Sequence, residues 1–110
     1  MTEQRHIEIA QLFKQLQEDF PEELGAFKAL SRLLERGGAI DQKTKDLILI
    51  ALACSTRCKK CIAVHIRNAV MNGAKRNEIL EAALLNVLFN GGAGIMDMHV
   101  VYEELFNHVD

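Results

Sequence analysis

The chain has 110 residues, enough for one domain and too few for two. Its net charge of −2 and the lack of a long basic block disfavour nucleic-acid binding. The first ten residues are polar, and the longest purely apolar run, residues 47–54, is too short to cross a membrane. We therefore expect one domain over residues 1–110 and a cytoplasmic location. Because 49% of the residues are hydrophobic, we also expect some apolar surface to lie between subunits.

Helical spacing of apolar residues runs through nearly the whole chain, and strand-like alternation is almost absent. A first helix is predicted over residues 3–19. Pro21 suits the first turn of a second helix, which Gly37 and Gly38 end. The apolar face of this second helix is predicted to be formed by Phe27, Leu30, Leu33 and Leu34.

The central part of the chain predicts a buried helix. Asp41 is a good N-cap for a third helix, and residues 47–54 are apolar on every side, so this helix should be the central one. Ser55 and Thr56 interrupt it. A fourth helix is expected over residues 58–72, a fifth over 75–89 and a sixth over 95–108, with a glycine corner at 91–94. The predicted fold is an all-α bundle of about six helices.

Three cysteines and a histidine lie within residues 54–65, which read CSTRCKKCIAVH. In the cytoplasm, closely spaced cysteines usually indicate metal binding or redox chemistry. On an uninterrupted helix these four side chains would spread over about 16 Å, whereas one zinc ion needs ligands about 2.0–2.3 Å away. We therefore favour a redox site and expect neither a metal nor an organic cofactor.

Cys58 and Cys61 form a C-x-x-C pair whose Cα atoms should lie about 5 Å apart on a helix, within the reach of a disulfide. The helix N-terminus near Cys58, together with Arg57 and two lysines, favours a thiolate. His65 follows Cys61 by four residues, shares its helix face and can accept a thiol proton. Cys54 ends the apolar run and is expected to be a small buried side chain, with a backup resolving thiol as the alternative.

A family resemblance rests on these residues. Residues 41–92, DQKTKDLILIALACSTRCKKCIAVHIRNAVMNGAKRNEILEAALLNVLFNGG, resemble the carboxymuconolactone decarboxylase and alkylhydroperoxidase D-like family. Its C-x-x-C-x-x-x-H motif is matched by Cys58, Cys61 and His65. The redox branch usually has a glutamate twelve residues before the first motif cysteine, and Asp46 stands there. The resemblance implies that this acid joins His65 in a proton relay; the alternative is a polar residue on an exposed helical turn.

The resemblance further implies an all-helical fold, assembly as trimers or hexamers, and thiol–disulfide chemistry. We expect an oxidoreductase that reduces alkyl hydroperoxides or exchanges disulfides, with a small hydroperoxide and an external dithiol reductant as partners. Cys61 is favoured as the attacking thiol because of His65, although the helix terminus favours Cys58. A decarboxylase or isomerase of a small acidic substrate and a non-catalytic redox-sensing oligomer remain open. His6 and His108 are predicted to be solvated, and no role is selected for His99.

Overall fold

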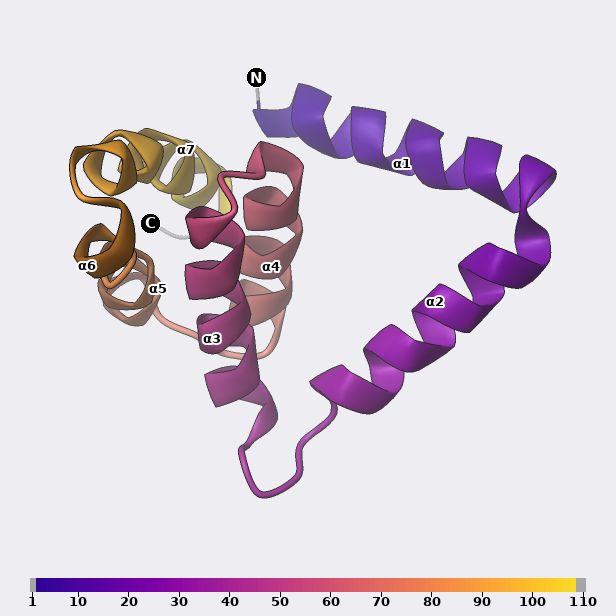
Figure 1. Cartoon of the computed structure of the whole chain (residues 1–110), viewed down its shortest axis with the longest axis horizontal. Coiled ribbons are helices and arrows are strands. Elements are labelled where there is room, and N and C mark those ends of the chain that lie inside the picture. Colours follow the sequence, from indigo (N-terminus) through magenta and orange to yellow (C-terminus); the bar gives the residue numbers. More distant parts are fainter. Residues whose placement is uncertain (1, 109–110) are drawn as a thin grey trace.

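The computed structural model describes the backbone of residues 2–108 and the side chains of residues 3–106. Over this part of the chain it is all-α, without strands (Figure 1). The fold class predicted from the sequence is therefore confirmed. The helices are α1 (Thr2–Asp19), α2 (Pro21–Glu35), α3 (Gln42–Ser55), α4 (Lys59–Met71), α5 (Arg76–Leu84), α6 (Val87–Asn90) and α7 (Gly92–His108). None of these helices combines the length and the apolar character that a bilayer crossing requires.

The hydrophobic core lies among α3, α4, α5 and α7. Helices α3 and α4 run side by side, and α5 and α7 pack against them (Figure 1). Burial of these side chains supplies the main driving force for folding. The largest fully buried apolar side chains of the core are Ile50, Ile62, Ile66, Ile79, Val101 and Leu105.

Helices α1 and α2 extend away from this bundle (Figure 1). Helix α2 contacts α1 and α3, and Leu24 is its one buried side chain. Its predicted apolar face is therefore not part of the core. The residues of that face are 53–63% exposed: Phe27, Leu30, Leu33 and Leu34. Helical periodicity identified an apolar face correctly, but no core element among the described residues covers it.

Helix α3 begins as predicted, because the Asp41 side chain accepts a hydrogen bond from the Thr44 N–H at 2.7 Å. The prediction of a central, buried helix holds for only one side of α3. Ile50 is fully buried, whereas Ile48 and Leu52 are 44% and 54% exposed. Helix α3 thus packs on α4 and α5 with one side and presents an apolar surface with the other.

The fifth predicted helix, residues 75–89, is divided into α5 and α6. The break lies at Leu85 and Asn86, where backbone hydrogen bonds reach only three residues back. Gly91, with φ of +53°, ends α6, and α7 starts three residues before the predicted position. At Gly94 a Cβ atom would meet the Val87 Cα at 3.1 Å, so this glycine lets α7 pack directly on the α6 backbone.

The N-terminal part of α1 is anchored to α7 by a buried carboxylate. Glu104 is fully buried, its Oε2 lies 2.7 Å from Arg5 Nη1 and its Oε1 lies 2.9 Å from His6 Nε2. The prediction that His6 is solvated is therefore wrong, since its side chain is only 17% exposed. The side chain of His108 lies outside the described residues.

Candidate redox site

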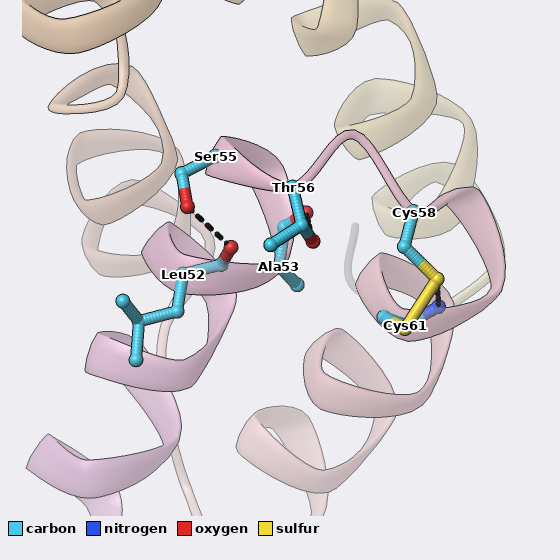
Figure 2. The surroundings of a disulfide bond; sticks show 6 residues. All are labelled: Leu52, Ala53, Ser55, Thr56, Cys58 and Cys61. Atoms are coloured by element: carbon cyan, nitrogen blue, oxygen red, sulfur yellow. Dashed lines mark hydrogen bonds between the residues drawn. A yellow bond between two sulfur atoms is a disulfide. The ribbon is translucent and has the colours of Figure 1, made fainter.

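The candidate site begins where α3 ends and α4 starts. The hydroxyls of Ser55 and Thr56 donate hydrogen bonds of 2.7 and 3.0 Å to main-chain carbonyls of the preceding turn (Figure 2). These bonds compete with continuation of the helix, which explains the interruption predicted there. Arg57 then adopts a left-handed conformation with φ of +58°, and Cys58 turns to an extended conformation as the N-cap of α4. The chain thereby re-enters a helix with Cys58 at its start.

Cys58 and Cys61 are joined by a disulfide across the first turn of α4 (Figure 2). Their Cα atoms lie 5.2 Å apart, as the helical spacing predicted. The Cys58 sulfur also accepts a hydrogen bond from the Cys61 N–H at 3.1 Å. A sulfur at an N-cap meets the free N–H groups and the positive end of the helix dipole, which stabilise its thiolate after reduction.

Two of the predicted cations near the disulfide have acidic neighbours. Arg57 Nε lies 3.0 Å from the Asp97 Oδ2 of α7, and Lys60 Nζ lies 4.0 Å from the Glu8 Oε1 of α1. Such exposed pairs contribute little to stability. Their effect is local: Asp97 and Glu8 offset part of the positive charge that the sequence places around the cysteines.

His65 follows Cys61 by one turn of the continuous helix α4 and is partly buried. It lines a groove of about 370 Å³ together with residues of α2 and α3. Burial lowers the pKa of His65, while the nearby Glu35 and Asp46 carboxylates oppose this change. The imidazole is therefore neutral at pH 7 and able to accept a proton. Its Nδ1 is buried and has no hydrogen-bond partner among the described residues.

Asp46 is only 1% exposed, so the alternative of an acid on an exposed helical turn is wrong. Its Oδ2 accepts a hydrogen bond of 2.7 Å from Asn72 Nδ2, at the C-terminal end of α4. The carboxylate is close enough to His65 to act on its pKa. Asn72 was not singled out from the sequence, because nothing in its local pattern reveals a partner 26 residues away.

Cys54 has no disulfide partner and is 1% exposed, as expected of a small buried side chain. Burial raises the pKa of its thiol to about 11, with Asp97 adding to the effect. A thiolate is therefore scarce at Cys54 at neutral pH, unlike at a helix N-terminus. The His99 side chain is 81% exposed, lies 3.9 Å from Glu103 and is not among the residues that line the His65 groove.

An all-helical fold that carries a dithiol at a helix start and an imidazole one turn later defines a class of helical C-x-x-C proteins. Residues 21–101 match the model of the carboxymuconolactone decarboxylase family, so the chain belongs to that family. The resemblance identified from the motif is thereby confirmed.

Two curated relatives are themselves uncharacterised proteins. One, encoded in the cox locus of Paracoccus denitrificans, is 40% identical over 68 residues, which cover 62% of this chain and 61% of the relative. The other, from Cupriavidus necator, is 29% identical over 92 residues, which cover 84% of this chain and 81% of the relative. The chain thus spans about three fifths of the Paracoccus relative and four fifths of the Cupriavidus one.

Solved structures of the same family show the same fold. A carboxymuconolactone decarboxylase family protein from Legionella pneumophila superimposes with a TM-score of 0.92 at 28% identity, over 99% of this chain and 97% of its own. A family member from Thermotoga maritima, for which a part in the antioxidative response has been suggested, gives a TM-score of 0.79 at 25% identity. That match covers 92% of this chain and 86% of the other.

Proposed function

We propose that this protein is a dithiol oxidoreductase that reduces organic hydroperoxides through reversible formation of the Cys58–Cys61 disulfide. The observation that carries the proposal is this disulfide at the N-terminus of α4, followed after one turn by the partly buried imidazole of His65. Family membership and the antioxidative role suggested for the Thermotoga relative support it. The proposal assigns the protein to the cytoplasm, where thiol reductants return such a cysteine pair to its reduced form.

Cys61 is the attacking thiol in this proposal, because it is more exposed than Cys58 and shares a helix face with His65. His65 takes the Cys61 proton, and the thiolate attacks the terminal peroxide oxygen. An S–O bond forms, the O–O bond breaks, and the sulfur is oxidised to a sulfenic acid. The alkoxide that leaves takes the proton from His65 and becomes an alcohol. Asp46, buried beside His65, stabilises the imidazolium while it holds the proton.

Cys58 resolves the sulfenic acid. Its thiolate, stabilised at the N-cap of α4, attacks the Cys61 sulfur and forms the disulfide. The hydroxide that leaves combines with the Cys58 proton to give water. One hydroperoxide and two thiols therefore become one alcohol, one water and one disulfide. An external dithiol then reduces Cys58–Cys61 through two exchange steps and is itself oxidised.

Counting thiols tests the proposal directly. The reduced protein, treated with one equivalent of cumene hydroperoxide, should lose two of its three free thiols within the mixing time of a manual assay. Mass spectrometry after alkylation should map the loss to one peptide that contains residues 58 and 61, with Cys54 still alkylated after unfolding. Retention of all three thiols would contradict the redox proposal. Decarboxylase activity that survives alkylation of the cysteines would then favour the decarboxylase alternative.

The proposed enzyme is a homo-oligomer, a trimer or a hexamer. The support is apolar surface that this chain leaves uncovered: Leu88 is 82% exposed, Phe89 90% and Phe27 59%. Large apolar side chains that are this exposed are typical of surfaces that another chain covers. Sedimentation should give a mass of three or six times 12.4 kDa, and Phe27→Glu should shift it downwards, whereas Gln17→Glu should not. A wild-type protein that sediments as a monomer at micromolar concentration would exclude this assembly.

A further inference from the structure

The end of α2 brings a second carboxylate to His65. Glu35, the last residue of α2, lines the same groove as His65 and is partly buried. The groove walls are otherwise mostly apolar, with Ser31 and Lys45 as the remaining polar side chains. Asp46 does not line this groove and is almost fully buried. The imidazole therefore has one carboxylate in the groove, that of Glu35, and a second one buried in the protein interior, that of Asp46.

The position of Glu35 is fixed from both sides. Lys45 Nζ donates hydrogen bonds to the main-chain carbonyls of Leu34 at 2.9 Å and Arg36 at 2.7 Å, the two neighbours of Glu35. This lysine ties the C-terminal end of α2 to the first turns of α3. Because its ammonium group is used on backbone carbonyls, it holds the Glu35 backbone at the groove without forming an ion pair with the Glu35 carboxylate.

Helix stability does not explain a glutamate here. The C-terminal end of a helix carries partial negative charge, so a carboxylate in the last turn is unfavourable. Among the residues that the structure describes, Glu35 has no hydrogen bond or ion pair through its side chain that would offset this effect. The Glu35 charge acts on His65 in the direction that favours the protonated ring, and more strongly than that of Asp46.

We infer that Glu35 is a positioning residue for His65, a carboxylate supplied by α2 that stabilises the imidazolium formed when His65 takes a thiol proton. Among the described residues, the charged groups that line the groove or act on the ring are Glu35 on α2 and Lys45 and Asp46 on α3, and Cys61 lies one turn earlier on α4. Lys45 is engaged with carbonyls and Asp46 with Asn72, which leaves Glu35 as the acid of the groove that is not committed to another partner. This role rests on the proposed function of His65.

The test is the protonation of His65, followed by NMR in the reduced full-length protein and assigned with His65→Gln. Glu35→Gln should shift its titration to lower pH, so that the protonated fraction on the alkaline side of the midpoint falls roughly two- to five-fold, as expected for one charge acting across several ångströms. Glu35→Asp should restore part of the shift. Glu18→Gln, which removes the same charge from an exposed site on α1, should leave the titration unchanged.

An unchanged His65 titration in Glu35→Gln, or an equal shift in Glu18→Gln, would overturn the inference. Loss of a carboxylate from the negative end of α2 should not unfold the helix, so the variant remains measurable. The titration requires no peroxide. A protein that consumes no hydroperoxide but shows the Glu35-dependent shift would therefore refute the proposed function, while the coupling between Glu35 and His65 would still be established.

Discussion

Cys61→Ser should reduce hydroperoxide turnover at least about a hundredfold, to the background of the assay. A serine hydroxyl remains protonated at neutral pH and cannot be oxidised to the equivalent of a sulfenic acid, so the first step has no nucleophile. The measurement is consumption of cumene hydroperoxide with a small-molecule dithiol as reductant.

Cys58→Ser should give a different result, which separates the two sulfurs. The first step should still occur once, and the Cys61 sulfenic acid should accumulate and react with dimedone, because no thiol one turn away resolves it. Cys54→Ala is the matched control, since it removes the buried thiol outside the disulfide and should keep full turnover. Full turnover in both Cys61→Ser and Cys58→Ser would show that the redox proposal is wrong.

Arg5→Ala should lower the free energy of unfolding by about 3 kcal/mol, a large share of the stability of a small protein. The substitution leaves the fully buried Glu104 carboxylate without its 2.7 Å partner, and His6 compensates only in part. Loss of one partner of a buried charge pair is costly because the other charge stays desolvated. Urea unfolding followed by circular dichroism gives the measurement.

Arg67→Ala is the control for this experiment, because Arg67 is exposed on α4 and its removal should change stability by no more than about 0.5 kcal/mol. The double variant Arg5→Ala, Glu104→Leu should recover part of the loss, since it removes the buried charge. If Arg5→Ala unfolds at the same urea concentration as Arg67→Ala, the link between α1 and α7 does not depend on this ion pair.

The local part of the candidate site could be predicted because it lies within one helix. Residues three and four apart in a helix are neighbours whatever surrounds them, so the placement of Cys58, Cys61 and His65 follows from their spacing. The pairing of Asp46 with Asn72 and the approach of Glu35 depend on how three helices pack. No short-range pattern encodes that packing.

The fold shows the same division between local and long-range information. Apolar periodicity identified α2 as a helix with an apolar face, but it does not say what covers the face, and Leu34 is 63% exposed. The break between α5 and α6 was missed for a related reason. It involves Asn86, whose side chain accepts a 2.6 Å hydrogen bond from Asn90 within a stretch that has ordinary helical periodicity.

The sulfur of Cys58 has two roles, since it accepts a hydrogen bond as the N-cap of α4 and forms half of the disulfide. Serine, aspartate or asparagine would begin the helix better, and such caps are worth about 1 kcal/mol relative to a poor one. Those residues would abolish the chemistry, so the first turn of α4 is restricted to a weaker start than ordinary helix preferences would select. Stabilising substitutions should therefore be sought elsewhere in the molecule, because at position 58 a residue that caps the helix better would remove the redox-active sulfur.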